Sequence, residues 1–188
     1  MYEQFDNIEQ DIITAIRDDD ESAFEILFRR YYPELCSYLN IYIRDKDEVE
    51  EMVQQLFLNI WERRKNFYPK NNVRSYLYKA VKNKAINYRK HLQIKERVIQ
   101  KIRNMQMIRE NNLEDEIDKT EMQLLIDKAV ERLPARCRET FILVKYNNFS
   151  YQEAADIMNI STHTVEIQIG KALKKLRSSL GTLILSQK

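Results

Sequence analysis

The sequence predicts an all-α protein built from two small helical domains joined by a linker, the second domain containing a helix-turn-helix. The chain has only 2 glycines and 3 prolines in 188 residues, which disfavours a β-rich fold with many tight turns. Apolar residues recur at the i, i+3, i+4, i+7 spacing of amphipathic helices in several separate segments. A polar, weakly periodic stretch at 93–118 divides the chain, so the predicted domains are residues 1–92 and 119–188.

The first predicted helices occupy the N-terminal third of the chain. Residues 22–43 are aromatic and aliphatic on more than one side, which predicts a largely buried helix or a pair of helices broken near Pro33. Residues 45–63 predict an amphipathic helix with one uninterrupted apolar stripe: Val49, Met52, Val53, Leu56, Phe57, Ile60 and Trp61. The acidic run at 18–21 is interpreted as loop and helix-start charge.

The next segment combines a loop with a third helix. Residues 63–72, RRKNFYPKNN, have no apolar period and include Pro69, so we expect a loop. A helix is expected from about 73 to 90, with these side chains facing inward: Val73, Tyr76, Leu77, Ala80, Val81, Ala85 and Tyr88. Together with the preceding helices it would complete the first domain, residues 1–92.

The linker and the start of the second domain follow. Residues 93–118 contain no Gly or Pro, which predicts a mobile linker with some helical content. A helical stripe restarts at Met122 and runs to Leu133. Pro134 can begin the next helix, because its missing N–H is harmless in a first turn. We expect that helix to end near Tyr146, before a left-handed stop at 147–148.

Two capped helices close the chain and predict a helix-turn-helix. Ser150 and Glu153 have the spacing of a capping box. Asn159 suits the left-handed turn, and Ser161 can cap the last helix. A short helix, a tight turn and a second capped helix are typical of DNA-binding modules.

The last helix, within ISTHTVEIQIGKALKKLR, has two different faces. Val165, Ile169, Ala172, Leu173 and Leu176 form the expected core stripe, and the opposite face holds Thr162, His163, Glu166, Ile167, Gly170, Lys171 and Lys174. In a major groove, Glu can accept from a cytosine amino group, Ile can touch a thymine methyl, and the lysines suit phosphates. An ordinary exposed face is the alternative, but the whole set favours DNA reading.

The charge distribution indicates two polyanion contacts. Residues 63–103 contain 14 basic residues and 1 acidic residue, and residues 132–188 contain 9 basic and 4 acidic residues. On the 73–90 helix one face holds Lys79, Lys82, Asn83, Asn87 and Lys90, with Arg74, Ser75 and Tyr78 near its start. Tyr78 lies out of phase with the core stripe, and Phe67 and Tyr68 lie in the loop. Cations beside exposed aromatics suit single-stranded nucleic acid, although Phe67 and Tyr68 could instead pack under the loop.

The 45–63 helix has a different outer face. Its side away from the core holds Glu51, Gln54, Gln55, Leu58 and Glu62. An apolar residue on an acidic face predicts a protein-binding surface, with a solvated face as the default alternative.

Several functional classes lack support in the sequence. With glycines only at 170 and 181 there is no phosphate-cradling loop. His91 and His163 are far apart and fit no metal or triad pattern, and Cys36 and Cys137 define neither a disulfide framework nor a zinc site. No apolar run approaches the ~18 residues of a membrane span, and MYEQFDN is unlike a signal peptide, so we expect a cytoplasmic protein without cofactor, metal or direct membrane insertion.

Three segments in order resemble the extracytoplasmic-function (ECF) group of the bacterial sigma-70 family. DKDEVEEMVQQLFLNIWERR is similar to the helix that binds core polymerase, and NVRSYLYKAVKNKAINYRK is similar to the promoter-melting helix. The third is LPARCRETFILVKYNNFSYQEAADIMNISTHTVEIQIGKALKKLR, which resembles the domain that reads the −35 element. The chain most resembles the subgroup tied to iron-citrate-type uptake regulation. Glu166 and Gln168 stand where many members carry Lys or Arg.

The resemblance implies a non-enzymatic initiation factor that needs no ATP or metal. Its implied partners are core RNA polymerase, promoter DNA and an anti-sigma factor, which can be membrane-anchored. Polymerase would bind Glu51, Gln54, Gln55, Leu58 and Glu62. The melted −10 strand would meet Asn72, Arg74, Ser75, Tyr78, Lys79, Lys82, Asn83 and Asn87. The −35 duplex would meet Arg138, Thr162, His163, Glu166, Ile167, Lys171 and Lys174.

Two other classes remain as alternatives. An autonomous helix-turn-helix regulator with an N-terminal helical sensor domain predicts a homodimer on a palindromic duplex, and it assigns no role to the first basic zone. A hydrolase acting on nucleic acid would need a carboxylate, His or metal spacing that the sequence does not contain.

Overall fold

The computed structural model describes residues 2–69, 72–102 and 121–186, and every regular element among them is helical. The chain divides into two compact units, Met1–Ile102 (unit 1) and Arg103–Lys188 (unit 2). The all-α prediction is therefore confirmed. The predicted limits of the domains, 1–92 and 119–188, stay a prediction, and most of the predicted linker lies outside the described residues.

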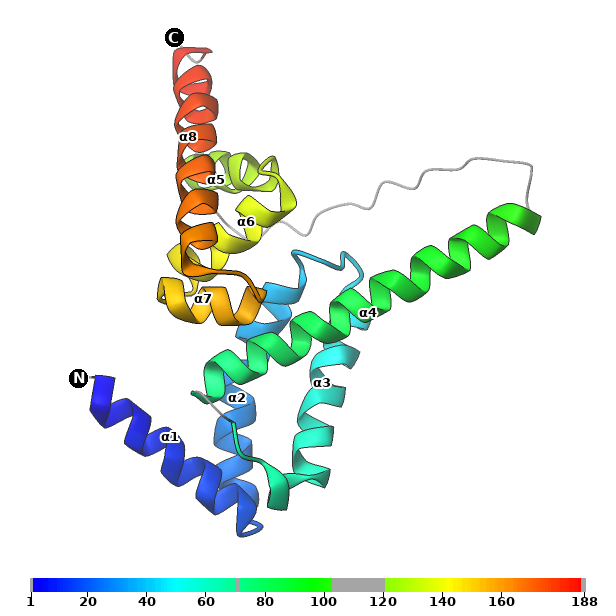
Figure 1. Ribbon diagram of the computed structural model, residues 1–188, viewed down its shortest axis with the longest axis vertical. Helices are drawn as coiled ribbons and strands as arrows, with labels where there is room; N and C mark the ends of the chain where they lie inside the picture. The colour runs from blue at the N-terminus through cyan, green and yellow to red at the C-terminus, as the bar shows by residue number, and fades with distance from the viewer. Residues whose placement is uncertain (1, 70–71, 103–120, 187–188) are drawn as a thin grey trace. The chain divides into compact units, whose positions relative to one another are not determined.

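Unit 1 contains four α-helices and one short 3₁₀ turn (Figure 1). They are α1 (Tyr2–Arg17), α2 (Glu21–Leu39), α3 (Lys46–Glu62), η1 (Arg64–Asn66) and α4 (Val73–Ile102). Figure 1 shows α2 beside α3, with α4 crossing both and extending beyond them. The helix α1 was not predicted from the sequence. The predicted end of α4 lay near Lys90, but the helix continues because no Gly or Pro follows to stop it.

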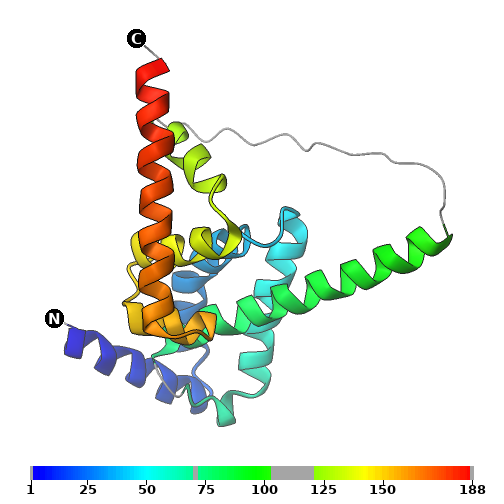
Figure 2. The same cartoon turned by 45° about the horizontal axis from the view of Figure 1, so that its top comes forward.

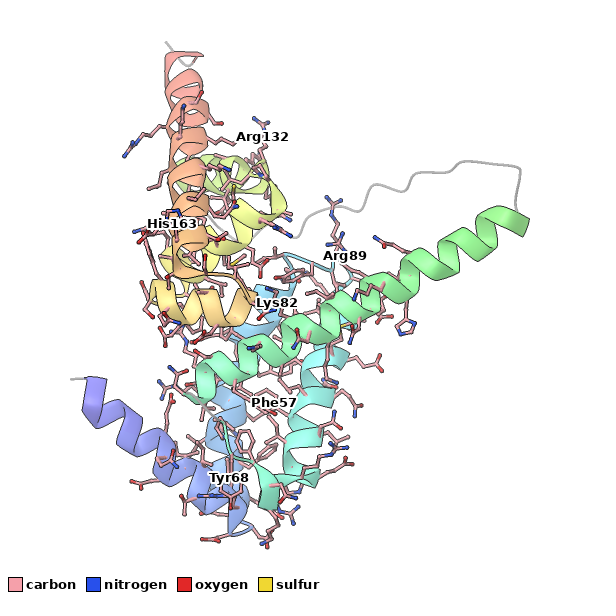
Figure 3. The ribbon with its side chains drawn as sticks, viewed as in Figure 1. Phe57, Tyr68, Lys82, Arg89, Arg132 and His163 are labelled. Carbon is pink, nitrogen blue, oxygen red and sulfur yellow. The ribbon has the colours of Figure 1, made fainter. Side chains whose placement is uncertain are left out.

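An aromatic cluster joins α2 to α3. Phe57 lies between the two helices (Figure 3), with ring centroids 6.2 Å from Phe24 and 4.9 Å from Phe28. The Trp61 ring lies 5.0 Å from Phe24. The helix α2 runs through Pro33 without interruption, so the single-helix alternative is right. Buried side chains on both sides of Pro33, among them Tyr31 and Leu35, offset the backbone hydrogen bond that the proline removes.

The turn before α2 confirms the interpretation of the acidic run. Asp18 and Asp19 follow α1, and the Asp20 carboxylate caps α2 by accepting from the backbone N–H of Ser22 at 2.8 Å and of Ala23 at 3.1 Å. Glu21 lies in the first helical turn, where a negative charge is favourable.

Unit 2 is built around the long helix α8 (Thr162–Ser186), against which three shorter helices pack (Figure 2). These are α5 (Glu121–Glu131), α6 (Ala135–Phe141) and α7 (Tyr151–Met158). A π-helical turn, η2 (Ile142–Tyr146), continues α6. The core between α5, α6 and α8 comprises Ala129, Val130, Leu133, Cys137, Phe141, Ala172 and Leu176.

The predicted helix limits in unit 2 are confirmed. Pro134 precedes the first residue of α6, and the helical run ends at Tyr146. Asn148 then takes a left-handed backbone conformation with φ 53°. The stripe that restarts the domain is confirmed in its C-terminal half, because Ala129, Val130 and Leu133 are buried; the side chains of residues 121–125 lie outside the description.

Candidate nucleic-acid and polymerase interfaces

The helix-turn-helix is formed by α7, a tight turn and α8. The Ser150 hydroxyl accepts from the Glu153 N–H at 3.2 Å, and the Glu153 carboxylate accepts from the Ser150 N–H at 2.8 Å, so the capping box is complete. Asn159 ends α7 in the left-handed conformation, with φ 54°. The Ser161 hydroxyl accepts from the Thr164 N–H at 3.1 Å at the start of α8. All the caps predicted from the sequence are confirmed.

The two faces of α8 separate as predicted. Val165, Ile169, Ala172 and Leu176 are buried, and Leu173 is half-buried against the same core. On the opposite side, Thr162 is half-buried, and His163, Glu166, Ile167, Lys171 and Lys174 are exposed. Ile167, an apolar side chain, is 42% exposed. This surface is called the recognition face below, and it comprises Thr162, His163, Glu166, Ile167, Gly170, Lys171 and Lys174.

The N-terminal end of the recognition face is partly ordered by its own side chains. His163 lies on the first turn of α8 (Figure 3), with its Nδ1 3.6 Å from Glu166 Oε2. A Cβ added at Gly170 would meet no atom within 4 Å, so packing inside unit 2 does not require a glycine there. Because Gly170 has no side chain, a DNA backbone could approach the middle of the recognition face closely.

Arg138 lies on another helix, α6. It is half-buried on α6, and its guanidinium donates to the Glu131 carbonyl at 3.2 Å, at the end of α5. In this position Arg138 ties α5 to α6. A contact between Arg138 and DNA stays a prediction.

The basic zone of unit 1 differs from the prediction in its phase. Tyr78 is fully buried, whereas Tyr76, predicted to face inward, is 39% exposed. Ser75 and Lys82 are also buried, with 4% and 7% exposure. The helix α4 packs against both α2 and α3, so its buried face is wider than one stripe and includes Ser75, Tyr78 and Lys82. The expectation that Tyr78 is an exposed aromatic is wrong.

A polar network holds Tyr78 inside unit 1. Its hydroxyl donates to Glu34 Oε2 at 3.2 Å, and its ring lies 4.9 Å from that of Tyr38. The Arg74 guanidinium lies 3.5 Å from the same Glu34 oxygen. Burial, and then the negative charge of Glu34, raises the pKa of the Tyr78 phenol well above its ordinary value.

The start of α4 and its outer surface complete this region. The Asn72 carboxamide accepts from the Ser75 N–H at 2.7 Å, so Asn72 caps the helix. Lys79, Asn83 and Asn87 are exposed on one side of α4, as predicted. Residues 70–71 of the preceding loop lie outside the described residues.

The two loop aromatics behave differently. Phe67 is 5% exposed and meets the Tyr76 ring edge-on at a centroid distance of 5.5 Å, so it packs under the loop. Tyr68 is 65% exposed, the largest exposure among the large apolar or aromatic side chains described. Four exposed side chains, Tyr68 in the loop and Lys79, Asn83 and Asn87 on α4, are together called the strand face below. The name refers to a nucleic-acid strand.

The outer side of α3 carries the predicted mixed surface. Glu51, Gln54, Gln55 and Glu62 are exposed, and Leu58 is 48% exposed among them. Gln54 donates to the Tyr32 hydroxyl at 3.5 Å, which links this surface to α2. These five residues of α3 are called the α3 face below. Within the described residues, no group of three His, Cys, Asp or Glu side chains is placed to hold a metal ion, and no helix is long and apolar enough to cross a membrane.

Comparison with known protein families identifies the family of this chain. The family model Sigma-70 region 2 matches residues 27–93, and the model Sigma-70, region 4 matches residues 123–176. The chain belongs to the sigma-70 family. The first match contains two of the three segments that resemble the family, and the second contains the third except for its last residue, Arg177.

The relatives of this sigma factor belong to the ECF group. It is 24% identical over 172 residues to ECF RNA polymerase sigma factor SigX of Bacillus subtilis, covering 87% of this chain and 86% of the relative. It is 23% identical over 184 residues to ECF RNA polymerase sigma-E factor of Escherichia coli K12, covering 94% and 96%. The ECF assignment is therefore confirmed. The iron-citrate-type subgroup is not confirmed and stays a prediction.

Two solved structures share the fold. One is the sigma factor RpoE in complex with the anti-sigma factor NepR from Bartonella quintana, with a TM-score of 0.63, 21% identity, and coverage of 84% of this chain and 96% of that one. The other is CnrH in complex with the cytosolic domain of CnrY, with a TM-score of 0.64, 20% identity, and coverage of 93% and 97%.

Proposed function

We propose that this sigma factor divides promoter recognition between its two units. Core polymerase would bind the α3 face, the melted −10 strand would meet the strand face, and the −35 duplex would meet the recognition face. The observation that carries the proposal is the coexistence, in one chain, of a capped helix-turn-helix in unit 2 and, in unit 1, a helix with exposed Lys79, Asn83 and Asn87 that follows a loop with the exposed Tyr68. Membership of the sigma-70 family supplies the general activity, which is to direct core polymerase to promoters and initiate transcription.

The proposed −10 contacts follow from exposure. Single-stranded bases stack on accessible rings, and their backbone follows accessible cations and amides. Tyr68, Lys79, Asn83 and Asn87 meet this condition. Ser75, Tyr78 and Lys82 are buried in unit 1, and Asn72 and Arg74 are engaged at the start of α4, so we assign these five to shaping the surface.

The proposed −35 contacts divide by chemistry. Glu166 and Ile167 lie where base edges would be read, and Lys171 and Lys174 lie further along the helix, where phosphates would be held. Thr162 and His163 flank the helix start, which favours an anionic group.

Promoter melting would need no catalysis by the sigma factor itself. Sigma factors are DNA-binding initiation factors, and the energy for melting would come from strand capture by the holoenzyme. That this chain has no catalytic activity and needs no cofactor stays a prediction. We place its action in the cytoplasm. We also propose that an anti-sigma factor regulates it, since the related RpoE was solved in complex with the anti-sigma factor NepR, and CnrH in complex with the cytosolic domain of CnrY.

Reconstitution tests the proposal. The full chain is mixed with core RNA polymerase of the same organism, and promoters are selected from a random DNA library by the resulting holoenzyme. We expect selection of two separated conserved elements and initiation downstream of them. An autonomous regulator would instead bind a palindromic duplex as a dimer without polymerase, and failure to form holoenzyme would contradict the proposal.

A further inference from the structure

The turn between α1 and α2 has a constrained shape. Asp19 adopts a left-handed backbone conformation with φ 69°, which Asp and Asn tolerate better than most residues. The Asp20 N–H donates to the Ala15 carbonyl at 3.0 Å on one side, and the Asp20 carboxylate caps α2 on the other. The direction of the Asp19 side chain is therefore set by both helices.

That side chain reaches the segment after α3. The Asp19 carboxylate accepts from Arg64 Nε, and it accepts from Lys65 Nζ at 2.6 Å. Hydrogen bonds from Lys65 and Arg64 lower the pKa of Asp19, so the carboxylate is ionised at neutral pH. Lys65 and Asp19 are 63% and 48% exposed, and exposed ion pairs add little to global stability. Their effect is local, on the position of η1.

The last residue of α1 contacts the same loop further along. The Arg17 guanidinium carbon lies 4.3 Å from the centroid of the Tyr68 ring, and the same guanidinium donates to Thr14 Oγ1 at 3.0 Å. Figure 3 shows Tyr68 in the loop close to this turn. The Arg17 guanidinium therefore lies over one face of the ring, while the side chain as a whole stays 65% exposed.

Nearby contacts hold the two ends of the loop. Phe67 is buried against Tyr76, and Arg64 donates to the Trp61 carbonyl at 2.8 Å while lying over the Trp61 ring at 4.3 Å. Arg64 and Phe67, on either side of Lys65–Asn66, are therefore held by Trp61 and Tyr76, while Asp19 of the turn contacts Lys65 and Arg17 at the end of α1 contacts Tyr68.

We propose that Arg17 and Asp19 are positioning residues for promoter opening, which hold Tyr68 where its free face can stack on an unpaired base of the −10 strand. This inference rests on the proposed function of the strand face. A ring that is already fixed loses less conformational freedom when it stacks, so the turn should favour strand capture. Neither residue would contact the closed duplex, and the affinity of the closed complex should not depend on them.

The test uses holoenzyme on the selected promoter, with a fluorescent base analogue in the −10 element to follow opening. Asp19→Asn keeps the tolerance for the left-handed conformation and removes both ion pairs. We expect opening to slow about tenfold, with closed-complex affinity within twofold of wild type. Asp18→Asn is the matched control, because Asp18 is exposed in the same turn and its carboxylate makes no ion pair within the described residues. This substitution should change neither the opening rate nor the closed-complex affinity.

Two further measurements separate positioning from a general loss of structure. On a promoter with a pre-opened −10 bubble, Asp19→Asn should initiate within about twofold of wild type, because opening is bypassed. In a Tyr68→Ala background, Asp19→Asn should slow opening less than about twofold further, because both changes act through one ring. Arg17→Lys keeps the charge but loses the flat guanidinium, and should slow opening as Asp19→Asn does.

Three results would overturn the inference. They are an equal loss on duplex and bubble promoters, a full Asp19→Asn effect without the Tyr68 ring, and wild-type opening by Asp19→Asn. Failure of the proposed strand face is distinguishable, because Tyr68→Ala holoenzyme would then open the promoter at the wild-type rate.

Discussion

At Tyr78, a phenol in the middle of a basic segment is kept neutral inside unit 1. The ring packs on Tyr38, and the hydroxyl donates to the Glu34 carboxylate, which also faces Arg74. An ionised phenol would meet both a low-polarity surrounding and a like charge. The pKa of Tyr78 is raised above 10.0 for these two reasons, so the side chain acts as a hydrogen-bond donor throughout the physiological range.

This arrangement predicts a pH-dependent stability difference. Above about pH 10 the unfolded state loses the Tyr78 proton while the folded state keeps it, so this contribution to stability is present below pH 10 and decreases as pH rises. Tyr78→Phe should lower the free energy of unfolding by about 1–2 kcal/mol at pH 8. The difference from wild type should shrink by pH 11.

Urea unfolding followed by the fluorescence of Trp61, the single tryptophan, reports this difference in unit 1. Tyr68→Phe is the control, because that side chain is exposed and its substitution should leave the pH profile unchanged. A Tyr78→Phe difference that is the same at both pH values would contradict the role of the buried phenol.

Substituting Glu166 and Lys171, two residues of the recognition face, should impair DNA binding in two different ways. Glu166→Ala should remove about 1–3 kcal/mol of discrimination at one −35 position, relaxing the preference there. Lys171→Ala should weaken binding to all sequences similarly and lower the salt slope by about one unit. Holoenzyme binding to promoters with each −35 base varied in turn measures both. Equal, sequence-independent losses would show that Glu166 reads no base.

At the scale of elements, α3 has an inner face that packs in the core and an outer face that we propose binds polymerase. Its inner stripe joins the aromatic cluster with α2, and its outer face combines acidic and amide groups with the half-exposed Leu58. Because the two faces share no side chain, the outer face can be changed without opening the core.

The double variant Glu51→Lys, Leu58→Arg should therefore abolish holoenzyme formation while unit 1 remains folded. Pull-down of core polymerase measures binding, and circular dichroism with thermal unfolding checks the fold, with a melting temperature expected within about 3 °C of wild type. Asp47→Lys with Glu50→Arg, on exposed positions of the same helix, controls for charge reversal alone. Wild-type affinity of the first variant would mean that the α3 face is only solvated.

For the whole molecule, the proposed function gives one DNA contact to each unit, and both contacts would engage one promoter. Their joint binding depends on whether both elements can be reached at once. Inserting 5 base pairs between the −35 and −10 elements rotates one element by about half a turn relative to the other. Initiation should fall by at least about tenfold although both elements are intact. Deleting the −35 element from the lengthened promoter should then have little further effect, and undiminished initiation would show that the units act independently.

The sequence alone predicted every helix except α1, the caps of the helix-turn-helix and the two faces of α3 and α8. Capping boxes, left-handed asparagines and amphipathic periods are local, so Ser150, Asn159 and both faces of α8 could be predicted from spacing. The recognition of the family rested on the same local patterns in order. The length of α4 was less predictable, since nothing local stops a helix that lacks glycine and proline.

Which side chains of the basic zone are accessible could not be predicted from periodicity, because it depends on how the helices pack. A single apolar stripe predicts a helix with one neighbour, but α4 contacts both α2 and α3, so Tyr78, Ser75 and Lys82 became buried and Tyr76 became exposed. The contacts of Arg17 and Asp19 with Tyr68, Arg64 and Lys65 join residues more than 40 positions apart. Periodicity describes a helix relative to its own axis, whereas accessibility and such long-range contacts depend on where neighbouring elements lie.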